Sequence, residues 1–508
     1  MFRAIVFDEC FFFLLILLVF DGPVEAPAVL VHNSSLTRMC WKENMTQQVE
    51  PSHEMWSSRW LFVLAAAGSA VGLGNIWKFP YIAGENGGGA FVLLYLVCVA
   101  VIGVPIMMAE VMLGREGRRS PINTMMSLTA RFRSNRLWVL IGWIGVIAGF
   151  LILSYYAVIA GWALSYIGRM AGGTFVGADT SVATNTFEDF LGDPLLMVFW
   201  QTLFLLITVW IISKGVVRGL ERAIRWFMPL LFVLLVVLLG YSIASNGFQQ
   251  GWNFMFSFNL EALDQDAVLV AMGQAFFTLS LGMGAIMAYG AYLPSASSIA
   301  GTVSVIAVLD TLVAIIAGLV IFPIVFVNGL EPQQGPGLMF VTVPLAFGQM
   351  PLGVFFGALF FLLVSFAAIT SAISISEPAL AYLVEKYKLK RSSIAIVLGF
   401  ISWILGIGTV LSFSSWSDFY LFGGLTFFDS VDYLSQNIML PFGGLLIAIF
   451  AAYVLPKNII KQQLGFTGET GMLLWKIFCG GIAPLGVLFV FITSGLGDLF
   501  ITLFSSVK

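Results

Sequence analysis

The sequence predicts an all-α polytopic membrane protein, and three observations support this. Hydrophobic residues make up 59% of the 508 residues and charged residues 10%, whereas an average soluble domain has about a quarter charged residues. Uncharged stretches of about 20 residues, long enough to cross a bilayer, recur along the chain. Two of the apolar segments also contain closely spaced glycines in mid-span. These features exclude a water-soluble enzyme.

The positions of the charges predict eleven transmembrane helices, because an unpaired charge inside lipid is unfavourable. We expect them at 60–82, 89–113, 137–168, 194–212, 216–244, 266–291, 301–328, 351–384, 392–411, 430–454 and 472–496. Between the seventh and the eighth, Gly335, Pro336 and Gly337 precede an apolar segment. This segment predicts a short re-entrant or capping helix.

Lys and Arg are concentrated in the loops on one side of the expected bundle. Loops 114–136, 213–225, 385–391 and 455–476 carry six, four, four and three of them, and the opposite loops are mainly acidic. Cytoplasmic loops carry the excess of Lys and Arg, so we expect the N-terminal side of the first helix in the cytoplasm. Eleven spans then place the C-terminus outside.

The first 44 residues fit this arrangement poorly. Their apolar run, Phe11–Phe20, is too short to span a bilayer. We expect residues 1–44 to be an over-long start that is not part of the native fold, with Met45 or Met55 as the initiator. A real extension that lies on the membrane is the alternative.

The first and sixth expected helices are interrupted at matching places. Glycines recur in Gly68–Asn75 and in Thr278–Gly284. Each glycine weakens a helix by about 1 kcal/mol relative to Ala, and backbone freed inside a membrane is tolerated where it lines a cavity or is buried in protein. Such a pair indicates a midplane site in a secondary transporter, with close packing through small residues as the alternative. We expect Glu110, in the second helix, to bond backbone exposed by the break in the sixth.

One segment resembles the signature of the neurotransmitter:sodium symporter family: GSAVGLGNIWKFPY at 68–81, followed by ENGGGAF at 85–91. The match covers 53–496 and is supported by GQAFFTLS at 273–280 and AAITS at 367–371. The resemblance is to the bacterial, eleven-helix amino-acid transporters of the family.

The resemblance implies a leucine-transporter-type five-plus-five inverted repeat with discontinuous helices one and six, in a bacterial cytoplasmic membrane. The expected segments are a cytoplasmic segment 45–59, a single transporter domain 60–496 (repeat one 60–244, repeat two 266–454, additional helix 472–496) and a C-terminal tail 497–508.

The resemblance also implies two bound sodium ions. Sodium site one would comprise Ala70, Asn75, Thr278 and Asp310, together with a substrate carboxylate. Sodium site two would comprise Gly68, Val71, Ala367, Thr370 and Ser371. Asp310 has a basis in the sequence as well, because it is the only charge between Asp266 and Glu331, and an ionisable residue inside a span indicates function. A buried carboxylate satisfied by hydroxyls, without an ion, is the alternative.

Chloride is not expected. In chloride-dependent relatives the positions of Asp310 and Ala314 resemble Asn and Ser, and the anion site is completed at positions matched here by Tyr95, Gln274 and Thr278. A fixed carboxylate at Asp310 can neutralise sodium without an anion.

The substrate-binding residues that the resemblance implies are Ala70, Gly72, Gly74, Ile152, Tyr156, Phe277, Thr278, Ser280, Met283, Ser371 and Ile375. Monoamine carriers resemble one another in having Asp at the position of Gly72. Without that Asp, the substrate must bring its own carboxylate, to which the Tyr156 hydroxyl can donate. Ile152, Met283 and Ile375 offer an apolar surface for a hydrophobic side chain. Core packing is the alternative for each residue taken singly.

The gate residues implied by the resemblance are Lys78, Asp432, Tyr156, Phe277, Trp56, Tyr292 and Glu385. Lys78 stands where relatives usually have Arg, and a Lys cannot fork onto Asp432, which predicts a looser outer gate. At the inner gate the family's Arg is replaced by His53. Either Arg59 substitutes for it, or the inner closure is weak or pH-dependent.

We therefore expect a sodium-coupled, chloride-independent importer of neutral, mainly hydrophobic L-amino acids that works by alternating access. A sodium-coupled osmolyte or γ-amino acid carrier is the alternative among transporters and would need a longer pocket. An ion channel is the alternative of a different class, but the intramembrane polar residues converge on one cluster instead of forming rings.

An enzyme is not expected, because no nucleophile–base pair lies within the spans. The expected partners are the amino acid, sodium ions and the lipid bilayer, and a net charge of −3 without a basic block gives no surface for nucleic acid.

Overall fold

The structure is a computed structural model that describes residue 56 and residues 58–493, except 259–262, 264, 331, 333–336, 423 and 467. Several expectations concern residues outside this described part, namely the extension 1–44, the initiators Met45 and Met55, His53, Gly335, Pro336 and the tail 497–508.

The described chain consists of helices and one two-stranded antiparallel hairpin. Its first half contains α3 (Arg59–Ala70), η1 (Gly74–Lys78), α4 (Phe79–Glu85), α5 (Gly89–Cys98), η2 (Val99–Gly103), α6 (Val104–Gly117), α7 (Pro121–Arg131), η3 (Arg136–Val139), α8 (Leu140–Ala171), α9 (Thr180–Leu191), α10 (Pro194–Ser213), η4 (Val216–Glu221), α11 (Arg222–Ile243) and α12 (Phe248–Phe256). Its second half contains α13 (Gln265–Thr278), α14 (Ala285–Ala291), α15 (Ile299–Val327), η6 (Leu338–Thr342), α16 (Val343–Gly348), α17 (Gly353–Tyr387), α18 (Arg391–Ser412), β1 (Tyr420–Phe422), β2 (Leu425–Thr426), α19 (Phe427–Asp432), η7 (Tyr433–Met439), α20 (Leu440–Ile449), η8 (Phe450–Val454), α21 (Lys457–Leu464), α22 (Glu469–Lys476), η9 (Ile477–Ile482) and α23 (Ala483–Thr493).

Within the described residues, nine helices are long and apolar enough to cross a membrane. A tenth span is the bent pair formed by α3 and the segment Gly74–Glu85, whose halves meet at 47°. The sixth expected helix is divided into α13 and α14, and neither half is long enough to count. The count is therefore nine or ten and does not reach eleven, because the expected break shortens both halves. The short helix expected after the seventh span is present as η6 and α16.

Side-chain caps explain where several helices begin. Ser58 Oγ accepts the N–H of Leu61 at 3.2 Å at the start of α3. Asp193 Oδ1 accepts the N–H of Leu196 at 3.0 Å, and Pro194 occupies the first position of α10. Both arrangements satisfy backbone donors that the first helical turn leaves unpaired.

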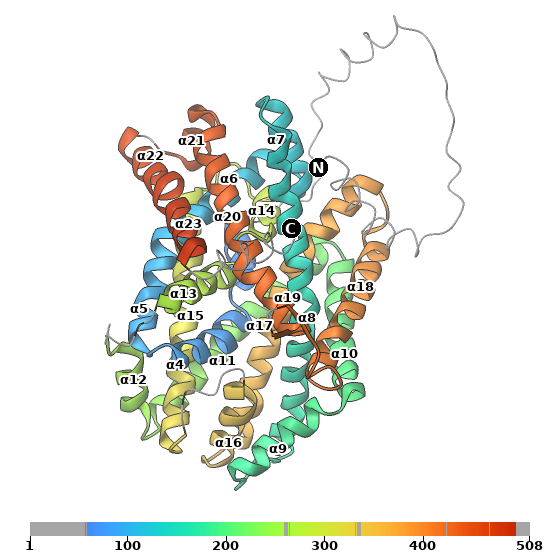
Figure 1. Cartoon of the computed structure of the whole chain (residues 1–508), viewed down its shortest axis with the longest axis vertical. Coiled ribbons are helices and arrows are strands. Elements are labelled where there is room, and N and C mark those ends of the chain that lie inside the picture. Colours follow the sequence, from blue (N-terminus) through green and yellow to red (C-terminus); the bar gives the residue numbers. More distant parts are fainter. Residues whose placement is uncertain are drawn as a thin grey trace, which may run out of the picture. The chain divides into compact units, whose positions relative to one another are not determined.

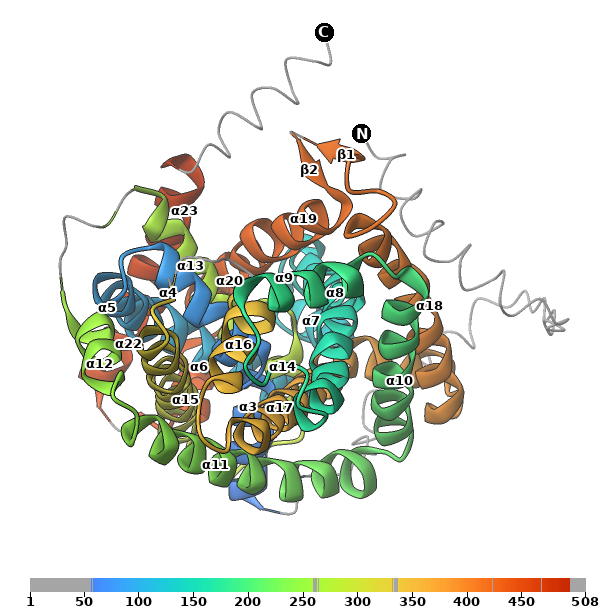
Figure 2. The ribbon, with the colours of Figure 1, turned by 90° about the horizontal axis from the view of Figure 1, so that it is seen from below.

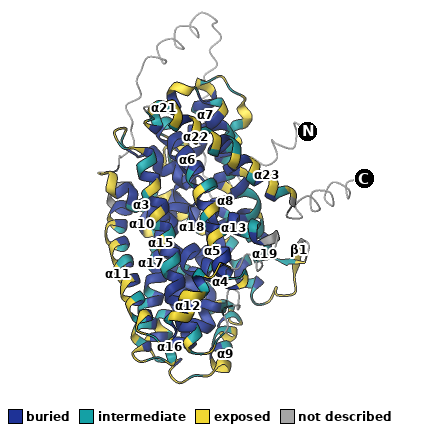
Figure 3. Ribbon diagram, turned by 90° about the vertical axis from the view of Figure 1, so that its left-hand side faces the viewer, coloured by how far each residue is buried: buried dark blue, intermediate teal, exposed yellow. Residues whose placement is uncertain are grey.

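The two longest helices, α8 and α17, pack against each other inside the bundle, whereas α11 runs along its outside (Figure 2). In the most apolar stretch of α17, 78% of the residues are buried inside the protein. In the corresponding stretch of the span that contains α11, 33% are buried. Figure 3 shows exposed residues along α11. Beyond Arg225, the large side chains exposed on this helix are apolar, among them Val233 and Val236. A helix that is apolar on its outer face as well as its inner face indicates contact with lipid.

The loops rich in Lys and Arg lie side by side. Arg115 Nε donates to Gln463 Oε1 at 2.6 Å, which joins loops 114–136 and 455–476. Arg391 Nε donates to the carbonyl of Ile212 at 2.7 Å, next to loop 213–225. Helices α7, α21 and α22 gather at one end of the bundle and α9, α12 and α16 at the other (Figure 1). The cytoplasmic assignment of the basic end stays a prediction.

Candidate functional site

The interrupted segments of the first and sixth spans face each other. Helix α3 ends at Ala70 and α13 ends at Thr278. Ser280, just beyond the end of α13, bonds Ser69 in the last turn of α3: Ser280 Oγ donates to the carbonyl of Ser69 at 2.9 Å, and the Ser69 hydroxyl donates to Ser280 Oγ at 3.2 Å. The two breaks therefore form one buried site.

Glycine is required where the break of the sixth span approaches α20. Gly282 has a φ of 76°, in the left-handed region that favours glycine. A Cβ at this position would lie 2.2 Å from the carbonyl oxygen of Leu440. The N–H of Gly282 donates to Glu110 Oε1 at 2.5 Å, and Glu110 is fully buried. The expectation that Glu110 bonds backbone exposed by this break is confirmed.

We expect Glu110→Leu to destabilise the protein and Glu110→Gln to be tolerated. The Gln carbonyl oxygen can still accept the N–H of Gly282, whereas Leu leaves this buried donor unpaired, at a cost of about 1–3 kcal/mol. Thermal unfolding of the purified variants in detergent measures the difference. Equal unfolding midpoints for the two variants would show that the hydrogen bond is dispensable.

A fully buried carboxylate, Asp310 of α15, lies beside the break of the first span. Asn75 Nδ2 donates to Asp310 Oδ1 at 2.8 Å and Thr278 Oγ1 donates to the same oxygen at 3.0 Å. The hydroxyl of Tyr95 donates to Asp310 Oδ2 at 3.3 Å. Gln274 Nε2 donates at 2.7 Å to the main-chain carbonyl just before Asn75. Three residues expected in sodium site one are thus in contact, and the fourth, Ala70, lines the adjacent cavity.

The groups around Asp310 suit a hard cation. The three side chains that bond its carboxylate are neutral donors, so none of them compensates its charge. A buried charge is strongly unfavourable unless it is paired. Carboxylate, amide and hydroxyl oxygens are also the ligands that hard cations take.

A second group of oxygens gathers where α3 meets α17. Ser371 Oγ lies 3.4 Å from the carbonyl oxygen of Gly68 and 3.4 Å from that of Val71. Thr370 Oγ1 donates to the carbonyl of Ala367 at 2.9 Å, and a Cβ on Gly68 would lie 3.5 Å from Thr370 Cβ. The structure therefore brings together the five residues expected in sodium site two.

A small cavity lies between these groups. Its lining consists of Ser69, Ala70, Gly72, Leu73, Gly74, Tyr156, Phe277, Ser280, Met283, Ser371 and Ile375. The lining holds the expected substrate-binding residues except Ile152, which is buried elsewhere on α8, and Thr278, whose hydroxyl bonds Asp310. Ser69 and Leu73 were not expected. The enclosed space is about 10 Å³, so a ligand as large as an amino acid requires lining side chains to move.

Gly72 is closely surrounded at the edge of this cavity. A Cβ there would lie 2.3 Å from Ser371 Oγ and 2.9 Å from the hydroxyl oxygen of Tyr156. That hydroxyl accepts the N–H of Leu73 at 3.3 Å, which leaves its own hydrogen to donate. A side chain at position 72 would therefore collide with polar groups that line the cavity.

Comparison with known proteins identifies the family. The model of the "Sodium:neurotransmitter symporter family" matches residues 53–177 and 191–497. The chain belongs to this symporter family. It is 37% identical over 440 residues to YhdH, an uncharacterized sodium-dependent transporter of Bacillus subtilis, covering 86% of this chain and 96% of the relative. A second uncharacterized sodium-dependent transporter, from Haemophilus influenzae, is 33% identical over 449 residues, covering 87% and 98% of the two chains.

The fold of the symporter matches a solved structure. The crystal structure of MhsT in complex with L-phenylalanine is 43% identical in sequence, with a TM-score of 0.82, and the match covers 87% of this chain and 99% of that one. The leucine-transporter-type fold is therefore confirmed, and so are the resemblance to the family and the classification as a sodium-dependent transporter rather than an enzyme.

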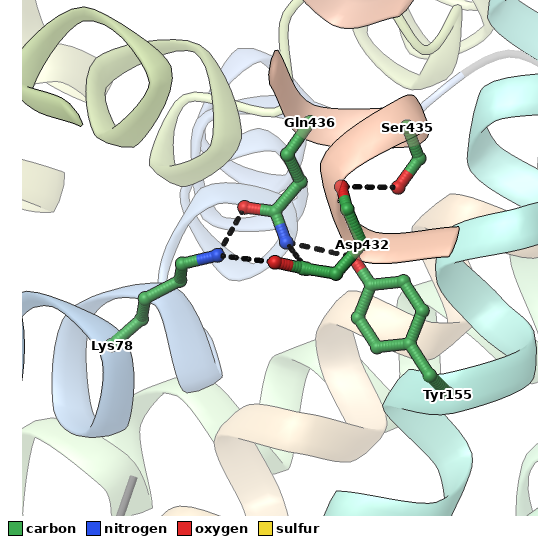
Figure 4. Close-up of polar contacts among 5 residues, drawn as sticks. All are labelled: Lys78, Tyr155, Asp432, Ser435 and Gln436. Carbon is green, nitrogen blue, oxygen red and sulfur yellow. Dashed lines mark hydrogen bonds and ion pairs between the residues drawn. The ribbon is translucent and has the colours of Figure 1, made fainter. Parts of the chain in front are cut away.

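The residues expected at the outer gate of the symporter are in contact. Lys78 Nζ lies 3.3 Å from Asp432 Oδ2 and 5.3 Å from the centroid of the Phe277 ring. Figure 4 shows a further partner, Gln436, whose Oε1 accepts from Lys78 at 2.6 Å. Lys78 therefore has two acceptors, whereas one was expected.

The inner network contains an acid that was not expected, because Tyr292 bonds Glu377. The pairing of Glu385 with position 53 lies outside the described residues and stays a prediction. The hydroxyl of Tyr292 donates to Glu377 Oε1 at 3.0 Å. Arg391 Nη1 donates to the same oxygen at 3.0 Å, and Arg391 Nη2 bonds Glu377 Oε2. The main-chain N–H of Trp56 donates to the carbonyl of Tyr292 at 3.3 Å. This cluster links Glu377, inside the eighth expected span, to residues next to the ends of the first, sixth and ninth expected spans.

Glu385 holds the start of α7. Its carboxylate accepts from the N–H of Ser120 at 2.7 Å, from Ser120 Oγ at 2.8 Å and from Asn123 Nδ2 at 2.6 Å. Arg59, considered as a substitute for the missing Arg, donates to Thr302 Oγ1 at 3.1 Å. Glu385 is eight residues beyond Glu377, about 12 Å further along α17, so the two acids can hold different elements. A carboxylate at a helix N-terminus is favourable, so Glu385 suits its position at α7.

Proposed function

We propose that this symporter imports neutral, mainly hydrophobic L-amino acids together with sodium, without chloride, across a bacterial cytoplasmic membrane. The observation that carries the proposal is the cavity at the two breaks, where Met283, Ile375 and Phe277 present apolar surface and the hydroxyls of Ser371 and Tyr156 lie beside Gly72. Hydrophobic surface with a few placed polar groups suits a small apolar ligand with one charged end.

The position of Gly72 supports a substrate with a carboxylate. Glycine leaves no acid at this point of the lining, so a free amine would find no countercharge there. A substrate carboxylate can accept from Tyr156 and approach the groups around Asp310, where it would help to hold a transported sodium ion. The complex of the related MhsT with L-phenylalanine is consistent with such a ligand.

Sodium would bind as a co-transported substrate at two places. One ion next to the amino acid would be held by Ala70, Asn75, Thr278 and Asp310. The second would lie among the carbonyl and hydroxyl oxygens of Gly68, Val71, Ala367, Thr370 and Ser371. Both groups of oxygens are contributed partly by the interrupted segment of the first span, so sodium and amino acid would order the same backbone and favour each other's binding.

Uptake or binding is expected to require sodium and to persist when gluconate replaces chloride, because Asp310 supplies a fixed negative charge. Thermal unfolding of the purified protein across the twenty amino acids, in sodium or choline salts, tests both parts. Hydrophobic amino acids at a hundred times their dissociation constant should stabilise the protein by about 2.7 kcal/mol in sodium only. Stabilisation by glutamate or lysine alone would contradict the substrate class, and a strict need for chloride would contradict the role of Asp310.

A further inference from the structure

Gln436 of η7 bonds two residues of the outer gate, which is defined here as Lys78, Asp432 and Phe277. Its Oε1 accepts from Lys78 Nζ at 2.6 Å. Its Nε2 donates to the hydroxyl of Tyr155 at 2.8 Å and to Asp432 Oδ1. Figure 4 shows the amide between the ammonium group and the carboxylate. Gln436 is 2% exposed, so bulk water does not substitute for these partners.

The orientation of this amide is determined by the charges on either side. Its oxygen faces the Lys78 ammonium group and its nitrogen faces the Asp432 carboxylate. The reverse orientation would direct two N–H donors at a cation and the carbonyl oxygen at an anion, so one orientation is strongly favoured. Gln436 therefore links the cation to the acid in a defined geometry.

Because residue 78 is Lys and not Arg, the contact between Lys78 and Gln436 has a role in holding the ammonium group. An Arg can hold a carboxylate through two parallel N–H···O bonds, whereas a Lys is a point charge on a flexible stem. The distance from Lys78 to Asp432 is 3.3 Å, long for a charge-assisted hydrogen bond, and the distance to Gln436 is 2.6 Å. The shorter bond holds the ammonium group 5.3 Å from the centroid of the Phe277 ring, within cation–π range.

The same amide extends the gate to α8. Tyr155 is buried and makes an edge contact with Phe428 at 5.6 Å between ring centroids. The next residue, Tyr156, lines the cavity, as Phe277 does. Gln436 thus bonds Lys78, Asp432 and Tyr155, the residue next to Tyr156 of the cavity. Each of these bonds uses a different hydrogen or lone pair of its amide.

We propose that Gln436 is a positioning residue of the outer gate, whose amide supplies the second contact that Lys78 cannot make by forking onto Asp432 and so keeps the gate closed over the cavity. This proposal rests on the proposed function only in taking the cavity at the two breaks as the substrate site. It does not depend on which amino acid is carried.

A double-mutant cycle tests this role. Gln436→Met keeps the length of the side chain and removes the amide, and Lys78→Arg supplies the fork. Ile375→Cys places a reporter thiol in the cavity. Gate opening is measured as the rate at which this thiol reacts with a membrane-impermeant thiol reagent, in whole cells, in sodium and without amino acid. The same chain without the reporter gives the background rate. Gln436→Met should accelerate labelling about tenfold when residue 78 is Lys, and by less than about threefold when it is Arg.

Ser435→Ala is the matched control. Ser435 is buried in the same helix and donates at 3.2 Å to the main-chain carbonyl of Asp432, away from Lys78, so its loss should leave the labelling rate unchanged. Gln436→Asn, which is one methylene too short to reach both partners, should reproduce the pattern if the Met variant is poorly produced. Equal acceleration in the Lys and Arg backgrounds, or none with Lys, would overturn the proposal. Because no amino acid is added, that outcome is separate from a failure of the proposed substrate class.

Discussion

Replacing Asp310 by Asn is expected to lower the apparent affinity for sodium at least about tenfold and to reduce uptake accordingly. Two unit charges 4 Å apart attract each other by about 4 kcal/mol at an effective dielectric constant of 20, and 1.4 kcal/mol corresponds to about a factor of ten. The Asn amide also directs N–H donors toward Asn75 and Thr278, which already donate to this position. Both effects act against a cation. The dependence of thermal stabilisation on sodium concentration measures the loss.

The same substitution should create a response to chloride when Ala314→Ser is added. Ala314 lies four residues after Asp310 on α15 and is buried, so the two positions share one helix face. A chloride ion could then replace the missing carboxylate charge next to Tyr95 and Thr278. Asp418→Asn, at an exposed acid, is the control and should leave sodium affinity unchanged. Unchanged sodium affinity in Asp310→Asn would show that this carboxylate is not needed for the ion.

The breaks in the two spans could be predicted because glycine carries its own physical signal. Three glycines within Gly68–Asn75 weaken a helix at membrane depth, and hydroxyl or amide residues accompany them. The structure places the two breaks in contact through Ser69 and Ser280. Single charges in apolar surroundings were equally informative: Asp310 and Glu110 are both fully buried and hydrogen-bonded.

Glu377 was not expected in the inner network, because the family pattern directed attention to Glu385. Glu377 lies inside the expected span 351–384, where an ionisable residue indicates a functional role. The rule that an ionisable residue inside a span indicates function would by itself have identified Glu377. Its partner Arg391 is the first residue of the next helix, α18. Sequence spacing does not show that Glu385 reaches α7, because the short helix in loop 114–136 was not expected.

Gln436 and Leu73 could not be found from residue type. Amide side chains occur in many helices, and only the three-dimensional arrangement shows that Gln436 lies between a cation and an acid that are far apart in sequence. Leu73 lines the cavity directly after the non-helical residues Val71 and Gly72, so the helical spacing of α3 gives no guide to its direction. The count of nine or ten spans among the described residues has the same origin, since the break divides the sixth span into α13 and α14, which are each too short to be counted.

Tyrosine is expected to bind at least about a hundredfold more tightly than tyramine, its decarboxylated amine. Without the carboxylate, the Tyr156 hydroxyl loses an acceptor, and an unsatisfied buried polar group costs about 1–3 kcal/mol. The first sodium ion also loses a ligand beside Asp310. Competition by the two compounds against a labelled hydrophobic amino acid, in sodium, measures the ratio. Among amino acids, Leu, Met, Phe, Tyr and Trp should compete better than Asp, Glu and Lys, whose side-chain charges would be buried against Met283 and Ile375 without partners.

Gly72→Ala should remove the binding of tyrosine as well, because the new methyl group would lie 2.3 Å from Ser371 Oγ and occupy the edge of the cavity that the carboxylate is expected to use. Gly168→Ala is the matched control. It also adds one methyl group to a glycine, but in α8, where nothing lies within 4 Å of the added carbon, so binding should be unaffected. Equal inhibition by tyrosine and tyramine in the unmodified protein would show that the carboxylate is not recognised. Unchanged tyrosine binding in Gly72→Ala would place the carboxylate elsewhere, because a methyl group and a carboxylate cannot fill the same space between Ser371 and Tyr156.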